Sequence, residues 1–215
     1  MHISDGFLPA AHCVAWGALV VPHLWDGARA TPDDDRRSAT RPALVAAIAF
    51  GFLLTALKLP SVAGSSAHPT GLALGTLLIG PRRMAAVALG ILVLQALLLA
   101  HGGLTTLGAN VWSLGVAGPW VAWWSWRGLR AAGVRSTIAV GVAAALADLA
   151  TYAVTAGQLA LAHGGELGGF GAAFVSMAGI FALTQLPIAL LEGALTATAW
   201  RALTGGDAMP REVPA

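Results

Sequence analysis

Charged side chains are scarce in this sequence. Asp, Glu, Lys and Arg make up 10% of its 215 residues, whereas 57% are hydrophobic and the mean hydropathy is +0.74. A typical soluble domain is about 25% charged, so this composition excludes the ordinary soluble classes. Stretches of about 20 apolar residues can cross a bilayer, and several are present. The sequence therefore predicts an all-α integral membrane protein.

Cysteine and lysine are nearly absent as well. The single cysteine, Cys13, lies in an apolar stretch and excludes an internal disulfide or a thiolate zinc site. The single lysine, Lys58, is followed by Leu and Pro, so the chain has no Gly-x-x-x-x-Gly-Lys-Ser/Thr phosphate loop. His-Glu-x-x-His and Gly-x-Ser-x-Gly motifs are also missing. We therefore expect no enzyme and no ATPase site within this chain.

Apolar runs with few charges divide the chain into seven predicted crossings. They cover residues 8–25, 42–59, 70–80, 84–100, 108–126, 134–163 and 171–203. The run 70–80 is too short for a straight span, and a broken or tilted helix is tolerated there only inside the protein. Together the crossings form one transmembrane domain, residues 1–204, followed by a short cytoplasmic tail, residues 205–215.

Basic residues predict the orientation in the membrane. All except Lys58 fall into four clusters between the predicted spans, and the positive-inside rule places these clusters in the cytoplasm, with the amino terminus outside and the carboxyl terminus inside. Arginines dispersed between spans do not suit a nucleic-acid partner. The clusters are Arg29, Arg36, Arg37 and Arg41; Arg82 and Arg83; Arg127, Arg130 and Arg135; and Arg201 and Arg211.

Tryptophans gather at the predicted inner ends of the spans. An interfacial belt explains such a distribution, because the indole ring is amphipathic; filling lipid-facing volume is the alternative. The residues concerned are Trp25, Trp120, Trp123, Trp124, Trp126 and Trp200.

The chain begins with a potential chelator, Met1-His2. The terminal amine, the His2 amide nitrogen and the His2 imidazole can close two small rings around one divalent cation. We expect Met1 to be retained, because the bulky His2 disfavours its removal, and cleavage of a signal peptide would destroy the site. Nitrogen ligands of this kind suit late transition metals, and binding them releases protons.

His68 lies in the predicted outer loop 60–69 and could supply a fourth nitrogen, although a loop histidine is more often simply solvated. Four nitrogens near one plane suit Cu(II) or Ni(II), and low-spin Co(II) is compatible. His101 opens the next outer turn and is the alternative ligand, or it caps a helix end or supports the ligands. Ser66 and Asn110 are further candidates for supporting the pocket.

Acidic side chains within or next to the spans need a partner, because an ionised group is costly in hydrocarbon. Asp148 and Glu192 are candidates for a proton relay, and hydrogen bonding between helices is the simpler interpretation. Asp5 could orient the His2 ring, but capping the first helix is the expected role.

Four stretches resemble the membrane-embedded substrate-binding subunits of energy-coupling-factor transporters for cobalt and nickel. The first is the opening Met1-His2-Ile3-Ser4-Asp5-Gly6-Phe7-Leu8-Pro9. Residues 57–71, 100–110 and 181–193 resemble the cobalt branch, CbiM, and include His101-Gly102-Gly103 and Thr184-Gln185-Leu186-Pro187. The nickel branch, NikM, tends to have a Gly-His-Leu loop where this chain has Ala67-His68-Pro69, which favours cobalt. The resemblance covers nearly the whole chain.

This resemblance implies a helical subunit of the bacterial inner membrane that captures Co(II), or alternatively Ni(II), for cobalamin synthesis. It implies that the metal is held by the Met1 amine, the His2 amide and imidazole, and the His68 imidazole. It also implies three kinds of partner: a transmembrane coupling subunit, a pair of cytoplasmic ATPases and a small accessory membrane subunit. We expect no fusion to the accessory subunit, and no cofactor apart from the transported metal.

Two other classes remain open at this point. A proton-coupled secondary metal carrier would use Asp148 or Glu192 as relay groups and would need no ATPase. A membrane metalloenzyme would need an open coordination position and a general base, and no candidate base lies near His2 or His68 in the sequence.

Overall fold

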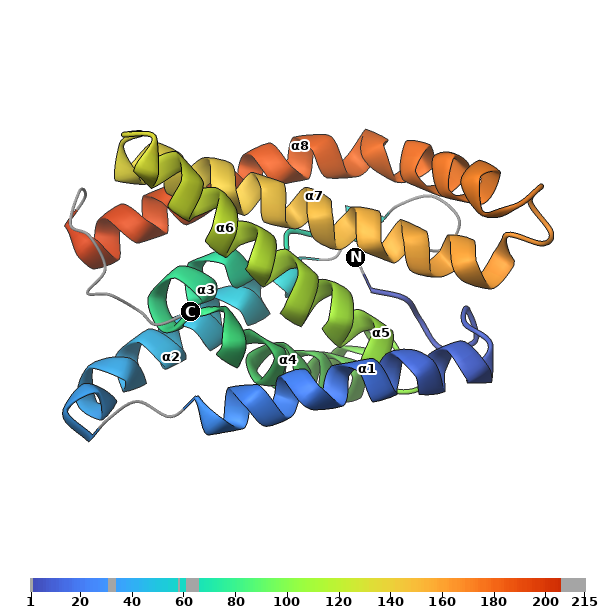
Figure 1. Ribbon diagram of the computed structural model, residues 1–215, viewed down its shortest axis with the longest axis horizontal. Helices are drawn as coiled ribbons and strands as arrows, with labels where there is room; N and C mark the ends of the chain where they lie inside the picture. Colours follow the sequence, from blue (N-terminus) through green and yellow to red (C-terminus); the bar gives the residue numbers. More distant parts are fainter. Residues whose placement is uncertain (1, 31–33, 58, 61–65, 206–215) are drawn as a thin grey trace.

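Long apolar helices build the protein, as the scarcity of charge predicts (Figure 1). The computed structural model describes residues 2–30, 34–57, 59–60 and 66–205, without the side chains of residues 34–40, 59–60 and 66. The α-helices in these ranges are α1 (Ala10–Arg29), α2 (Asp34–Ala56), α3 (Leu72–Ile79), α4 (Met84–Leu99), α5 (Leu107–Val111), α6 (Gly118–Ala131), α7 (Ser136–His163) and α8 (Phe170–Thr204). A 3₁₀ turn, η2 (Pro81–Arg83), precedes α4, and a π-helical segment, η3 (Trp112–Ala117), joins α5 to α6.

Three helical stretches in the described ranges are long and apolar enough to cross a membrane: Pro81–Leu99, Ser136–His163 and Phe170–Thr204. With a rise of about 1.5 Å per residue, a helix of about 20 residues covers the hydrocarbon core. The predicted spans correspond to helices of the structure, and the all-α prediction is confirmed. The predicted tail, apart from Gly205, lies outside the described residues.

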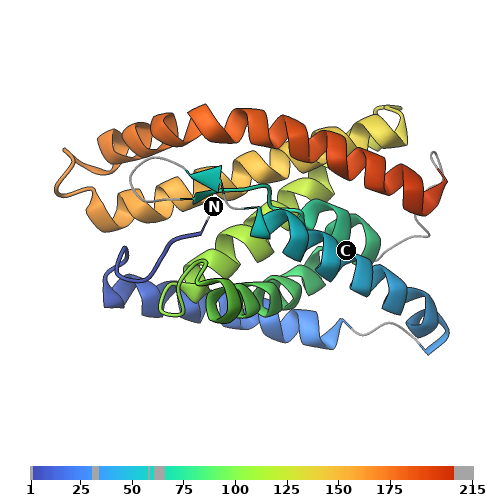
Figure 2. The ribbon, with the colours of Figure 1, turned by 180° about the vertical axis from the view of Figure 1, so that it is seen from behind.

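Helices α7 and α8 lie side by side in both ribbon views (Figures 1 and 2). Gly141 and Gly193 lie in close contact between them: a Cβ added at Gly193 would lie 2.6 Å from the Gly141 carbonyl oxygen. Close packing of small residues is how helices associate where lipid removes the hydrophobic driving force. This pair forms one wall of the protein, against which α6 packs.

Helix α3 is the short run that sequence analysis could not fit to a straight span. Its eight residues cover only about 12 Å, and nearly all of them are buried. The loop before α3 is closed at its neck by two short strands, β1 (Leu59–Pro60) and β2 (Ser66–Ala67), which pair antiparallel with Leu59 opposite Ala67. The strand pair leads directly into His68.

The tryptophans do not form a single interfacial belt. Trp123, Trp126 and Trp200 are at most 9% exposed and pack into one core cluster with Leu74 and Val140. For these three residues both sequence interpretations, belt and lipid-facing filler, are wrong. Trp25 and Trp124 are exposed, by 61% and 59%. The difference arises because Trp123 and Trp126 of α6 face a cluster formed with residues of α3, α7 and α8.

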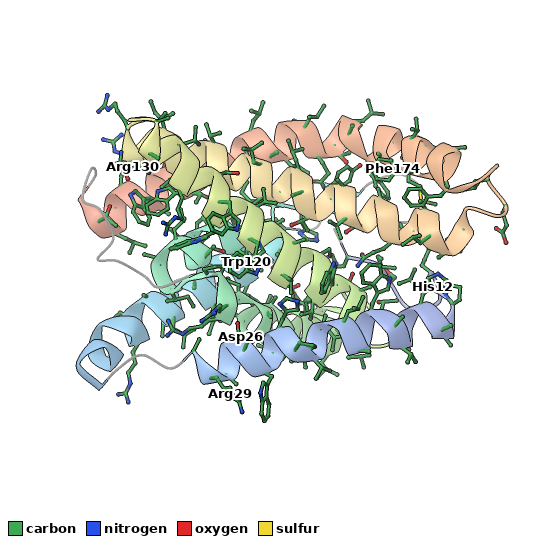
Figure 3. The ribbon with its side chains drawn as sticks, viewed as in Figure 1. His12, Asp26, Arg29, Trp120, Arg130 and Phe174 are labelled. Atoms are coloured by element: carbon green, nitrogen blue, oxygen red, sulfur yellow. The ribbon has the colours of Figure 1, made fainter. Side chains whose placement is uncertain are left out.

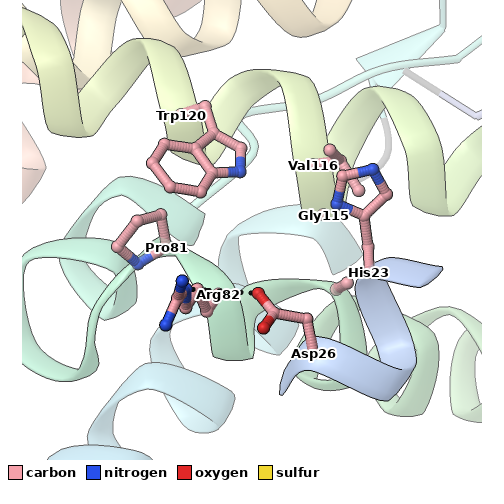
Figure 4. Close-up of a pocket in the computed structure, with 8 residues that line it drawn as sticks. His23, Asp26, Pro81, Arg82, Gly115, Val116 and Trp120 are labelled. Carbon is pink, nitrogen blue, oxygen red and sulfur yellow. Dashed lines mark ion pairs between the residues drawn. The ribbon is translucent and has the colours of Figure 1, made fainter. Parts of the chain in front are cut away.

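Basic side chains gather toward one end of the helices. Figure 3 shows Arg29 and Arg130 on the side of the molecule opposite to His12 and Phe174. Figure 4 shows a pocket near that basic end, where the Arg82 guanidinium lies 3.2 Å from the Asp26 carboxylate, beside His23 and Trp120. Because Asp26 is paired with a cation, it is a poor ligand for a metal ion, and this pocket is not the metal site that the sequence predicts.

Candidate metal centre

The amino-terminal segment folds back from α1 into the protein (Figures 1 and 2). Asn110 fixes it: its Oδ1 accepts a hydrogen bond from the Ile3 N–H at 2.8 Å, and its Nδ2 donates to the Ile3 carbonyl at 2.9 Å. The Thr106 hydroxyl donates to the same carbonyl at 2.6 Å. With both polar backbone groups of Ile3 held, the position of the preceding residue, His2, is set.

Two further contacts hold this segment in place. The Asp5 carboxylate accepts hydrogen bonds from the Thr105 N–H at 2.8 Å, from the Thr105 hydroxyl and from the Leu104 N–H at 3.3 Å. The Thr105 hydroxyl and these backbone bonds lower the pKa of Asp5. A ring nitrogen of His163 lies 2.8 Å from the Phe7 carbonyl oxygen. The predicted roles of Asp5, as a cap of the first helix or a partner of His2, are both wrong, because its oxygens bind the 104–105 turn instead.

Three imidazoles meet at the amino-terminal end of this segment. His2, His68 and His101 each offer a ring nitrogen, and these three atoms lie within 4.8 Å of one another. The ring centroids of His2 and His68 are 4.4 Å apart, as are those of His2 and His101. All three side chains are at most 3% exposed. Residues from the start of the chain, from the loop before α3 and from the turn after α4 thus converge on one buried point.

The chemistry of this cluster is that of neutral nitrogen donors. Neither ring nitrogen of His2, nor Nε2 of His68, has a hydrogen-bond partner among the described residues. Burial lowers the pKa of His2 and of His68 well below its usual value, and in His2 the neighbouring His68 adds to this effect. Buried polar atoms normally have partners, and neutral imidazole is the form that binds metals. The arrangement is therefore suited to a transition metal ion.

Glu192 of α8 holds the loop that carries His68 through hydrogen bonds. The Glu192 carboxylate accepts hydrogen bonds from the Thr70 N–H, the Thr70 hydroxyl and the Gly71 N–H, at 2.5–2.9 Å. Gly71 precedes α3 with a φ of +66°, which favours glycine. Nδ1 of His68 lies 2.9 Å from the Pro69 carbonyl oxygen, which leaves Nε2 directed to the cluster. Hydrogen bonding between segments is thus confirmed for Glu192, and a relay role for Asp148 or Glu192 stays a prediction.

Of the residues that sequence analysis singled out, the structure brings together His2, His68, His101 and Asn110. Met1 lies outside the described residues, as does the side chain of Ser66, so their predicted roles are not tested. Sequence analysis missed the holding roles of Thr106, Asp5 and His163. The role of Thr106 could have been suspected, because Thr106 lies within residues 100–110, one of the stretches that resemble the family.

Gly103 makes the approach of the amino-terminal segment possible. A Cβ added there would lie 2.5 Å from both the Asp5 nitrogen and Oδ1. We expect Gly103→Ala to push this segment out and to lower the affinity for Co(II) by about tenfold, the cost of disturbing groups that support a metal site. A Co(II) titration of the purified protein followed by visible absorption measures the effect. Gly165→Ala, where the added Cβ meets nothing within 4 Å, is the control; equal affinities of the two variants would contradict this prediction.

The site and the fold define a multi-pass membrane protein with a buried cluster of three imidazoles that could hold a metal ion. Two solved structures share the fold: one, described as the crystal structure of a truncated transition metal transporter, aligns with a TM-score of 0.81 at 24% identity and covers 96% of this chain and 100% of that one. The other, a transition metal transporter, has a TM-score of 0.82 at 24% identity and covers 95% and 93%.

Sequence comparison identifies the family. Residues 2–209 match the family CbiM, described as the cobalt uptake substrate-specific transmembrane region. The proteins named cobalt transport protein CbiM include one from a Roseiflexus species, 50% identical over 94% of this chain and 82% of that protein. Another, from Streptomyces coelicolor, is 48% identical over 94% and 88%. The chain belongs to the CbiM family and is a multi-pass protein of the bacterial inner membrane.

Proposed function

We propose that this chain is the metal-capturing subunit of an importer for Co(II). The observation that carries the proposal is the convergence of three buried imidazoles, His2, His68 and His101, with nitrogens within 4.8 Å of one another. Family membership and the names of the relatives support cobalt as the cargo. Burial of the cluster also supports a transport role, since a captured ion would be enclosed by protein.

In this proposal the ion is bound by the Met1 amine, the His2 amide and imidazole, and the His68 imidazole. Support comes from the way Asn110 holds Ile3: the residue before it is buried and directed at His68. The closing of small chelate rings by adjacent backbone and side-chain nitrogens favours an ion of the late first row. Ni(II) is the alternative cargo, because the same four nitrogens suit it.

Energy for import would come from partner subunits. The sequence has no phosphate loop, so we propose a pair of cytoplasmic ATPases, a transmembrane coupling subunit and a small accessory membrane subunit as partners, with cobalamin synthesis as the destination of the metal. The clustering of arginines toward one end supports a cytoplasmic location of that end. The metal centre would then open toward the outside, with the amino terminus external.

The proposal is tested by titrating the purified full-length chain in detergent with Co(II) and following visible absorption. We expect His2→Ala and His68→Ala each to lower the Co(II) affinity at least about tenfold, because each removes a ligand. His12→Ala, which removes an imidazole of α1 from outside the cluster, should leave the affinity unchanged. Unaltered binding in both cluster variants would refute this site.

A further inference from the structure

An unfavourable backbone conformation at Ala100 places His101 in the imidazole cluster. Helix α4 ends at Leu99, and the next residue, Ala100, has a φ of +46°, a left-handed conformation that is unfavourable for a residue other than glycine. The His101 N–H then donates to the Gln95 carbonyl at 3.1 Å. This turn places the 3%-exposed His101 ring against His2 and His68. A strained residue held in place beside a cluster of ligands points to a functional contact.

The three rings are close enough for one ion. Two neighbouring nitrogens bound to the same ion at about 2.1 Å lie about 3 Å apart. The three ring nitrogens lie within 4.8 Å of one another, so shifts of about 1 Å in each of these side chains bring them to that spacing.

The His101 ring is steeply inclined to both other rings. It makes an interplanar angle of 61° with His2 and 71° with His68, whereas the His2 and His68 rings are inclined by 47° to each other. In the proposed function, four nitrogens from the terminus, His2 and His68 already surround the ion near one plane. A further imidazole can reach the ion only from outside that plane.

We propose that His101 supplies a fifth nitrogen to the ion, from outside the plane of the other four, and thereby favours Co(II) over Ni(II). The inference rests on the proposed function. Ni(II) with four strong nitrogen donors is satisfied by a square plane, and its filled axial orbital repels a fifth donor. Co(II) has one electron fewer, so its axial orbital is only half filled and accepts the imidazole lone pair. The four planar nitrogens bind both Co(II) and Ni(II), and His101 increases the affinity for Co(II) alone.

The test compares Co(II) chloride and Ni(II) chloride titrations of the full-length chain with those of His101→Ala. We expect the variant to lose about tenfold in Co(II) affinity, with little change for Ni(II), and the Co(II) visible bands to change in position and intensity. Added imidazole should restore the bands, because it enters the position left by the side chain. His12→Ala is the control. The ratio of the two affinities is the main readout, since a loss of folded protein lowers both metals alike and leaves the ratio unchanged.

An unchanged ratio together with unchanged Co(II) bands would overturn the assignment of His101. If His2→Ala and His68→Ala lose both metals while His101→Ala keeps the ratio and bands, only this inference fails. If the cluster variants also bind Co(II) normally, the proposed function fails with it. Should alanine prevent purification, His101→Gln keeps the volume and polarity of the side chain without an imidazole, and the same ratio decides.

Discussion

Insertion of two glutamines between Met1 and His2 is expected to lower the affinity for Co(II) by about a hundredfold or more, beyond the cost of disturbing a supporting group. Every side chain of the native protein is retained in this variant. Because Asn110 holds both backbone groups of Ile3, His2 keeps its place and the terminal amine is displaced by about 7 Å. The amine can then no longer close a small ring with the His2 amide. Glutamine is bulky enough to keep Met1 in place.

The measurement is again a Co(II) titration, with thermal unfolding of the apo protein as the companion. The Tm should change little, since the hydrogen bonds of Ile3, Asp5 and Phe7 remain. An equal insertion after Glu166, in the exposed turn between α7 and α8, is the control. If the amino-terminal insertion binds Co(II) as tightly as this control, the terminal amine is not a ligand.

The second large effect is expected at Glu192. Glu192→Ala would leave the Thr70 N–H, the Thr70 hydroxyl and the Gly71 N–H without their buried acceptor. Unsatisfied buried donors cost about 1–3 kcal/mol each, so the loss of stability is about 3 kcal/mol or more. The loop that carries His68 would be released at the same time, and the Co(II) affinity should fall with the Tm.

Glu192→Gln should give a smaller loss, because one amide oxygen still accepts while the NH₂ group faces donors. Thr198→Ala is the matched control on the same helix: its hydroxyl is exposed and bonds only within α8, to the Ala194 carbonyl. A fall in Tm with unaltered Co(II) affinity would mean that Glu192 supports the packing of α8 and has no part in placing His68.

Much of the fold follows from the sequence, because the membrane imposes it. Where backbone polar groups cannot bond to solvent, uncharged runs must become helices, and α4, α7 and α8 begin and end within a few residues of the predicted limits. Helix α2 is the exception: it begins at Asp34, eight residues before the predicted span, because a solvated polar segment can continue a helix beyond the membrane.

The contacts between helices could not be predicted in the same way. The hydrophobicity of tryptophan is the same at an interface and in a core. Only the packing of α6 against α3 and α7 decides that Trp123 is buried while Trp124 is exposed. Likewise, Asp5 and residues 104–105 are about 100 positions apart. A pairing over that distance has no local signal, so Asp5 was assigned to the nearest helix instead.

The imidazole cluster was predictable to the extent that its members lie in predicted outer segments. His2 and His68 were expected together, with His101 as the alternative ligand, because the predicted threading puts all three on the outer side, and the structure brings the three rings together. The positions of Asn110 and Thr106 decide how the amino terminus enters the site, and they depend on the exact rotation of α5, which hydrophobic runs do not encode.

The π-helical segment η3 lies within a continuous helical rod, between α5, which holds the amino-terminal segment, and α6, which packs in the aromatic core. An α-helix advances by about 100° per residue, so an uninterrupted rod from Leu107 to Ala131 would lock the direction of Asn110 to that of Trp123. The wider turn at Trp112–Ala117 resets this angular phase. The change in angle is a fixed one, and with it Asn110 faces the amino-terminal segment while Trp123 packs in the aromatic core.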